Sequence, residues 1–151
     1  MIPCQIDHDW IAAHIPHQGS MCLLDRVESW DSERIVCLAS SHRSPDNPLR
    51  AHGKLASVCG VEYAAQAMAV HGALLASGKP SGAGYLVSVR DTRLLVARLD
   101  DISADLTLKA SCITISGSNL LYQFEILAND RLLLNGRATV MLNAFMEKSS
   151  I

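Results

Sequence analysis

The chain has 151 residues, of which 49% are hydrophobic and 19% charged, and its formal net charge is −2 at pH 7. This composition excludes a disordered chain and predicts a single domain over residues 1–151 with a hydrophobic core. The scattered Lys and Arg residues argue against nucleic acid as a partner. Hydrophobic runs stay below the roughly 18 residues of a membrane-spanning helix, so we expect no membrane contact.

The first third of the chain predicts a short helix followed by a β-hairpin. Asp9–Ile15 has a helical pattern that Pro16 ends. Met21–Trp30 and Arg34–Ser40 are strand-like runs on either side of a short polar turn, which is typical of a hairpin. Residues 42–51 are rich in Pro, Asn, Asp and Ser and predict a loop.

The remainder predicts one long helix and then a series of strands. Between residues 58 and 77, apolar and Ala residues recur at helical spacing, and Gly78 and Pro80 form an expected end. Apolar and polar residues then alternate, as in strands with one buried face. We expect these strands at Gly84–Val89, Thr92–Ala97, Asp105–Ser116, Leu120–Leu127 and Leu132–Leu142. This order predicts an α+β fold with one curled antiparallel sheet wrapped around a long central helix.

The spacing of the cysteines and histidines, and the lack of a phosphate-binding glycine motif, limit the kinds of site that the chain can form. The five cysteines are widely spaced and form no CxxC pair, which argues against both a disulfide framework and a zinc site. Reduced thiols and the lack of a signal-peptide pattern in the first residues predict a cytoplasmic protein. The histidines show no ligand-like spacing, and there is no phosphate-binding glycine loop. We therefore expect no metal and no cofactor.

Two segments resemble a known family. The first is Ile15-Pro-His-Gln-Gly-Ser-Met-Cys-Leu-Leu-Asp-Arg-Val27, and the second runs from His52 to Gly72 and contains Gly60-Val-Glu-Tyr-Ala-Ala-Gln-Ala-Met-Ala69. Both are similar to segments of the 3-hydroxyacyl-[acyl-carrier-protein] dehydratases of fatty-acid synthesis. The pattern resembles a divergent branch of that family with members in aryl-polyene-type pathways. The resemblance implies the hotdog fold over nearly the whole chain.

The resemblance also implies a catalytic pair formed by a loop His and a helix Glu fourteen residues later. Counting from His52 reaches Gln66, so an amide stands where the family has its acid. Glu62 lies one helical turn earlier on the same face as Gln66. We expect His52 to act as the base and Glu62 as the acid, with the pKa of its carboxyl raised by burial in an apolar tunnel.

Other residues are candidates for binding. The unpaired backbone N–H groups of Gly60 and Val61 at the start of the long helix are expected to hold the substrate carbonyl oxygen, with Gln66 as a polarising amide. His17, in a turn, is expected to make only a structural hydrogen bond. The predicted basic rim for an acidic carrier protein consists of Arg43, Arg50 and Lys54.

The expected activity is dehydration of a 3-hydroxyacyl thioester, linked to acyl carrier protein or coenzyme A, to the trans-2-enoyl thioester in fatty-acid or polyene-type biosynthesis. Two alternatives stay open at this point. One is an acyl thioesterase on the same fold, and the other is a non-catalytic acyl-binding subunit beside an active dehydratase. Exposed sheet edges predict a homodimer or a higher multiple, or a heteromer with a related dehydratase.

Overall fold

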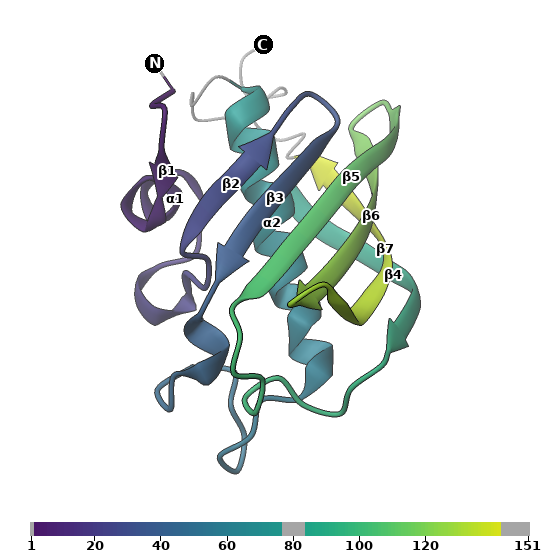
Figure 1. The fold of residues 1–151 in the computed structure, drawn as a ribbon. Helices are drawn as coiled ribbons and strands as arrows, with labels where there is room; N and C mark the ends of the chain where they lie inside the picture. Colours follow the sequence, from purple (N-terminus) through teal and green to yellow (C-terminus); the bar gives the residue numbers. More distant parts are fainter. Residues whose placement is uncertain (1, 77–83, 143–151) are drawn as a thin grey trace.

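A computed structural model describes residues 2–76 and 84–142 of the chain (Figure 1). Its elements, in chain order, are β1 (Ile6–Asp7), α1 (His8–His14), η1 (Gly19–Met21), β2 (Arg26–Trp30), β3 (Arg34–Ala39), η2 (Ser41–Arg43), η3 (Ser57–Cys59), α2 (Gly60–Leu75), β4 (Gly84–Leu94), β5 (Leu106–Ser116), β6 (Asn119–Ala128) and β7 (Arg131–Leu142). Three of them, η1 to η3, are single 3-10 turns.

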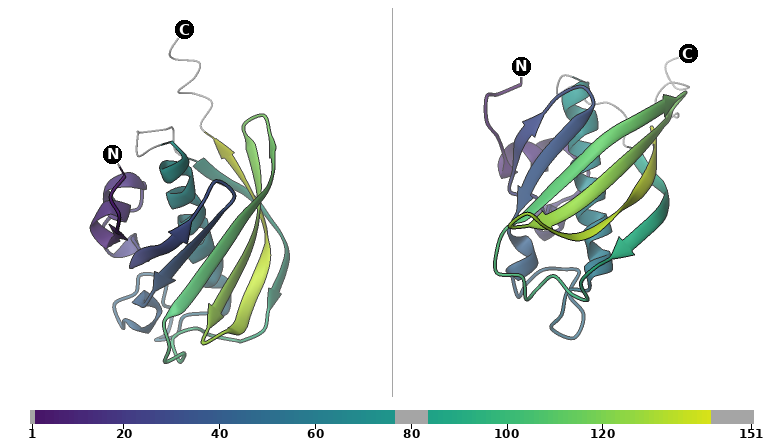
Figure 2. Two further views of the ribbon diagram at one scale, coloured as in Figure 1. Left: turned by 45° about the horizontal axis from the view of Figure 1, so that its top comes forward. Right: turned by 45° about the vertical axis from the view of Figure 1, so that its right-hand side comes forward.

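The strands form one antiparallel sheet in the order β1-β2-β3-β5-β6-β7-β4. The sheet curves around α2, and β1 and β4 form its two open edges (Figures 1 and 2). This arrangement confirms the α+β fold expected from the sequence. Within the described residues, no helix combines the length and hydropathy needed to cross a membrane.

The core lies between α2 and the concave face of the sheet. Alternate residues of the central strands are almost fully buried against the helix, namely Leu106, Leu108, Ala110, Tyr122, Phe124 and Ile126. Burying a large apolar side chain contributes roughly 1.5–3 kcal/mol. Because each strand alternates strictly here, the register between strands decides which residues face α2 and which face away from it.

The structure differs from the expected elements in three places. The strand predicted at Met21–Trp30 begins only at Arg26, because the segment before it leaves the sheet to contact α2. The two strands predicted over residues 84–97 are one strand, β4, which has an irregularity between Arg90 and Arg93 and ends at Leu94. The short strand β1 was not predicted. The helix end predicted at residues 77–80 lies outside the described residues.

Candidate functional site

The start of α2 lies very close to the sheet. Gly60 is buried, and a Cβ at this position would lie 2.8 Å from Leu134 Cδ2 and 3.0 Å from Ile126 Cδ1. The turn η3 runs directly into α2, so the backbone N–H of Gly60 donates to the carbonyl of Ser57. The expectation that this N–H is unpaired is therefore wrong, and the role of Gly60 in substrate binding stays a prediction. Val61 packs half-buried against the core, and its role in substrate binding stays a prediction.

Gln66 joins α2 to the segment between α1 and β2. Its side chain is fully buried. Oε1 accepts the backbone N–H of Leu23 at 2.9 Å, and Nε2 donates to the carbonyl of Met21 at 2.7 Å and to Glu62 Oε1 at 3.2 Å. Both amide hydrogens are thus engaged within the chain. Gln66 therefore connects α2 to the segment before β2, and the polarising contact to substrate expected from the sequence stays a prediction.

Glu62, on the first turn of α2, lies against His17. The distance from His17 Nε2 to Glu62 Oε1 is 3.0 Å, and the two side chains are 24% and 32% exposed. Glu62 Oε1 thus accepts hydrogen bonds from both His17 and Gln66, and among the described residues no hydrogen bond or ion pair involves Oε2. Oε1 of Glu62 is therefore held in place by two neighbours. Oε2 belongs to the same partly exposed side chain and has no such bond among the described residues.

The pKa of the Glu62 carboxyl is lowered, chiefly because His17 donates a hydrogen bond to the carboxylate. Burial acts in the opposite direction, and the hydrogen bond from Gln66 lowers the pKa further. The expected raised pKa is therefore wrong, because hydrogen bonds to the charged form outweigh desolvation here. Since a carboxylate only accepts hydrogen bonds, His17 Nε2 carries the proton. His17 Nδ1 is enclosed and finds no hydrogen-bond partner among the described residues.

His52 lies apart from this pair. It is exposed in a tight turn that is closed by two backbone hydrogen bonds between Ala51 and Lys54, of 2.8 and 3.0 Å. His52 and Gly53 both have positive φ, at 54° and 75°. Among the described residues no hydrogen bond or ion pair links His52 to Glu62. The chain thus brings Glu62 together with His17, and the catalytic role expected for His52 stays a prediction.

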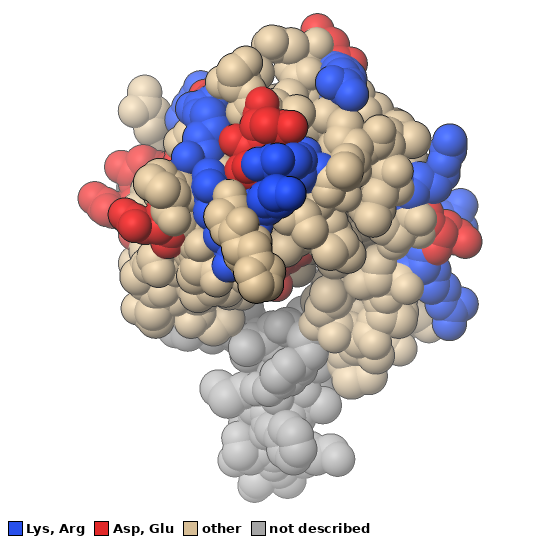
Figure 3. All heavy atoms as spheres, turned by 90° about the horizontal axis from the view of Figure 1, so that it is seen from below, with Lys and Arg blue, Asp and Glu red and all other residues tan. Residues whose placement is uncertain are grey.

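The cations of the predicted carrier-binding rim differ in their surroundings. Arg43 forms an ion pair with Asp105 at 2.7 Å and donates to the carbonyl of Ser103. Arg50 donates to the carbonyls of Gly53 and His42, at 3.2 and 3.3 Å. Lys54 is exposed. At this lower end of the molecule, acidic and basic side chains lie beside one another (Figure 3). The carrier-binding role of the three cations stays a prediction.

A second polar network holds the loop after β3 against α2. Tyr63 is fully buried, and its hydroxyl lies 2.7 Å from Ser41 Oγ and 2.9 Å from Asn47 Nδ2. Burial raises the pKa of the Tyr63 phenol, so this group stays neutral and available for hydrogen bonding. The sequence pattern placed Tyr63 on the helix but carried no signal of partners 16 and 22 residues earlier.

Comparison with known proteins identifies the fold. The family model for ApeP-like proteins, described as ApeP dehydratase, matches residues 10–149. The structure is similar to the ApeI:P dehydratase heterocomplex from Xenorhabdus doucetiae, with a TM-score of 0.77, 20% identity, and coverage of 93% of this chain and 95% of that chain. No curated protein sequence matches.

Two thioesterases share the same hotdog architecture. Zebra fish thioesterase superfamily member 2 has a TM-score of 0.64 and 15% identity, with coverage of 90% of this chain and 95% of that chain. The thioesterase HI1161 from Haemophilus influenzae has a TM-score of 0.57 and 15% identity, with coverage of 78% and 77%. At these identities the likeness shows the fold alone, and it confirms the hotdog fold that the sequence resemblance implied.

Proposed function

Since this chain belongs to the ApeP-like dehydratase family, we propose that it converts a 3-hydroxyacyl thioester to the trans-2-enoyl thioester, with the acyl group carried by acyl carrier protein or coenzyme A. The observation that carries this proposal is the carboxylate of Glu62, held at one oxygen by His17 and Gln66. Such a group is positioned for proton transfer, which is the main chemical requirement of dehydration. The pathway we propose is fatty-acid or polyene-type biosynthesis.

The reaction removes a proton from C2 and a hydroxyl from C3. We assign the first step to Glu62 Oε2, which accepts the C2 proton while Oε1 stays hydrogen-bonded to His17. The electrons of the C2–H bond form the C2=C3 double bond, and the C3–O bond breaks. The carboxyl then returns the proton to the departing hydroxyl, and water leaves. A lowered pKa suits the first step, because the carboxyl is ionised at neutral pH.

The proposed assembly is a homodimer or a heteromer with a related dehydratase. β4 forms an edge of the sheet, and β7 is its only hydrogen-bonded neighbour among the described strands. An unpaired strand edge is a template for pairing with another chain. The similar structure from Xenorhabdus doucetiae is itself described as a heterocomplex, which supports the heteromeric form.

The test is turnover of a 3-hydroxyacyl thioester, followed by the enoyl absorbance. We expect Glu62→Gln to lower turnover by at least roughly 100-fold, because a positioned acid–base group contributes at least that much. The matched control is Glu28→Gln, which replaces an exposed carboxylate on β2 and is expected to leave turnover unchanged. Native-like turnover by Glu62→Gln would refute the assignment.

The same assay separates the competing candidates. His52→Ala tests the base that the family resemblance implies. If His52→Ala lowered turnover as much as Glu62→Gln does, both groups would be needed for proton transfer. Release of free thiol in place of the enoyl product would favour the thioesterase. Acyl binding without either product would favour the non-catalytic subunit. That alternative is suggested by Gln66, whose amide stands in the position of the family acid.

A further inference from the structure

The convex face of the sheet, turned away from α2, carries a hollow of about 400 Å³ whose lining is both polar and apolar. It spans β4, β7, β6 and β5. Its lining contains two guanidinium groups and several hydroxyl groups, contributed by Arg90, Arg137, Ser88, Thr114, Ser116 and Thr139. Because Glu62 lies on α2, on the concave side, this hollow is separate from the proposed catalytic site, and only the choice of candidate ligands for it rests on the proposed function.

Arg90 and Arg137 lie directly opposite each other in the β4–β7 register. Like charges at opposite positions of neighbouring strands are destabilising, so this pair is unfavourable without an anion. Among the described residues, neither guanidinium has an ion pair or a side-chain hydrogen bond. The two neighbouring guanidinium groups thus have no acceptor side chain within the described part of the chain.

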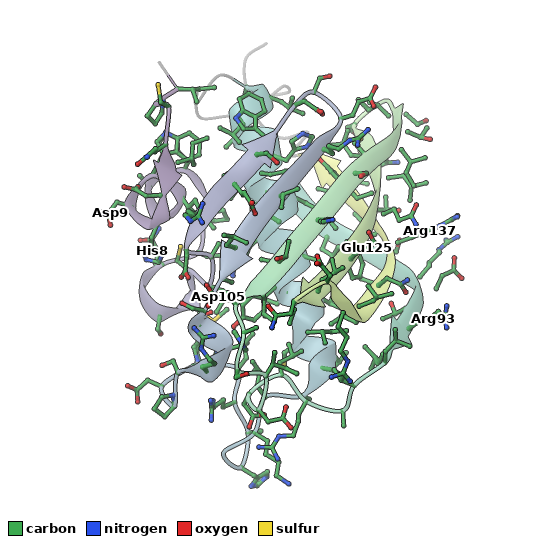
Figure 4. The ribbon with its side chains drawn as sticks, viewed as in Figure 1. His8, Asp9, Arg93, Asp105, Glu125 and Arg137 are labelled. Atoms are coloured by element: carbon green, nitrogen blue, oxygen red, sulfur yellow. The ribbon has the colours of Figure 1, made fainter. Side chains whose placement is uncertain are left out.

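Asp91 lines the same hollow and supplies one negative charge against the two positive ones. It lies at the irregularity of β4 with a positive φ of 54°. Arg93, the next cation on β4, is exposed, and Figure 4 shows Arg93 and Arg137 both pointing away from the body of the molecule. In Figure 3, basic side chains gather on this same right-hand side around acidic atoms. The lining of the hollow thus carries the positive charges of Arg90 and Arg137 against the one negative charge of Asp91, and its net charge is positive.

We propose that this hollow binds a phosphoryl group. Two planar guanidinium groups offer paired N–H donors that match phosphate oxygens, and serine and threonine hydroxyls supply further donors. The register places Ser88 opposite Thr139, two residues along the same strands from the two arginines. The phosphoryl group comes either from a small molecule such as coenzyme A or from the phosphopantetheine arm of a carrier protein, because both have the same chemistry.

Titration with inorganic phosphate, followed by backbone amide NMR shifts, tests the proposal. Chloride at equal ionic strength is the reference. We expect phosphate-specific shifts centred on Arg90, Arg137 and Thr139, and an affinity at least about tenfold weaker in Arg137→Gln, since one charged hydrogen-bonding group is lost. Arg34→Gln removes an exposed arginine from β3, outside the hollow, and should leave the affinity unchanged. Shifts no different from those in chloride would overturn the proposal.

Thermal unfolding provides a second measurement. Without phosphate, Arg90→Gln should unfold at a higher temperature than the native chain, because the repulsion between two opposed cations is relieved. Phosphate should raise the unfolding temperature of the native chain and have little effect on Arg90→Gln. An equal effect of phosphate on both would count against the site.

Competition then identifies the source of the phosphoryl group. Displacement of phosphate by coenzyme A, but not by pantetheine, would assign a small-molecule ligand. Displacement by carrier protein with its phosphopantetheine arm, but not without it, would assign the carrier. Displacement by carrier protein regardless of the arm would contradict the phosphoryl assignment, because the acidic protein surface would then be sufficient.

Discussion

Glu62 combines a fixed position with a lowered pKa, and both properties come from His17 and Gln66. The two neighbours bond to the same carboxylate oxygen. Gln66 in turn is held by the backbone of Met21 and Leu23. The carboxylate is therefore positioned by a chain of hydrogen bonds that extends from α2 to the segment before β2, and its charge state depends mainly on His17.

His17 should therefore control the pH dependence of turnover. The hydrogen bond from His17 lowers the pKa of Glu62, so the carboxylate persists to lower pH than it would alone. We expect His17→Phe to raise that pKa and to move the acid limb of the pH–rate profile to higher pH. His17→Gln keeps a hydrogen-bond donor and should move the limb back toward its native position.

The measurement is kcat across the acid range for the native chain and both variants. A merely structural role of His17 would lower kcat at every pH without moving the limb. An acid limb that stays in place in His17→Phe would therefore contradict the role given to the His17–Glu62 contact.

Sequence reasoning found Glu62 but missed its partner. Glu62 is predictable because it lies on the first turn of a helix with a family-like pattern, one turn before Gln66. The contact with His17 joins residues 45 positions apart, and the pattern around Pro16 and His17 indicates only a turn. The pKa of Glu62 was predicted in the wrong direction because burial can be anticipated from an apolar helix, whereas a hydrogen bond from a distant loop cannot.

At the scale of elements, the position of α2 depends on how closely its first turn approaches the sheet. Gly60 permits that approach, because any side chain would meet the methyl groups of Leu134 and Ile126. We expect Gly60→Ala to lower the free energy of unfolding by about 1–3 kcal/mol, the usual cost of overpacking a core. The matched control is Gly72→Ala, since no atom lies within 4 Å of a Cβ there.

Gly72→Ala should instead stabilise the chain by roughly 0.5–1 kcal/mol, because Ala is the better helix former. Urea unfolding of both variants measures the difference. Equal effects of the two substitutions would show that helix propensity, and not the contact with the sheet, determines the response at Gly60.

The elements themselves were mostly predictable. β5 and β6 alternate clearly between apolar and polar residues, so their place and their buried faces follow from the pattern. β1 was not predicted because a strand of two residues is too short to show an alternation of apolar and polar residues. The order of strands in the sheet, which places β4 at an edge and forms the hollow on the convex face, depends on pairing between distant segments that no local pattern specifies.

At the scale of the whole molecule, two buried histidines join separate parts of the fold. His71 on α2 contacts the Tyr122 hydroxyl at 2.7 Å and the Asp31 carbonyl at 2.8 Å, which connects the helix to β6 and to the β2–β3 turn. His42 in η2 contacts the carbonyls of Ile102 and Ala104 through Nε2, and its buried Nδ1 has no partner among the described residues. Carbonyls only accept, so Nε2 carries the proton in both rings.

These two histidines should make the fold sensitive to mild acid. Burial lowers the pKa of both imidazoles from the ordinary value of 6.5. Below about pH 6.5 the unfolded chain therefore binds protons that the folded chain does not, and the free energy of unfolding falls as the pH drops toward the folded pKa values. Each group can contribute a slope of up to about 1.4 kcal/mol per pH unit in that range.

Urea unfolding between pH 7.5 and the acid limit of solubility measures this slope. His71→Gln should lower the stability at neutral pH, because a buried hydrogen-bond network is disrupted, and should also flatten the slope, because one titrating group is gone. His42→Gln should flatten it in the same way. If both buried variants kept the native slope, the loss of stability in acid would have to come from groups other than His42 and His71.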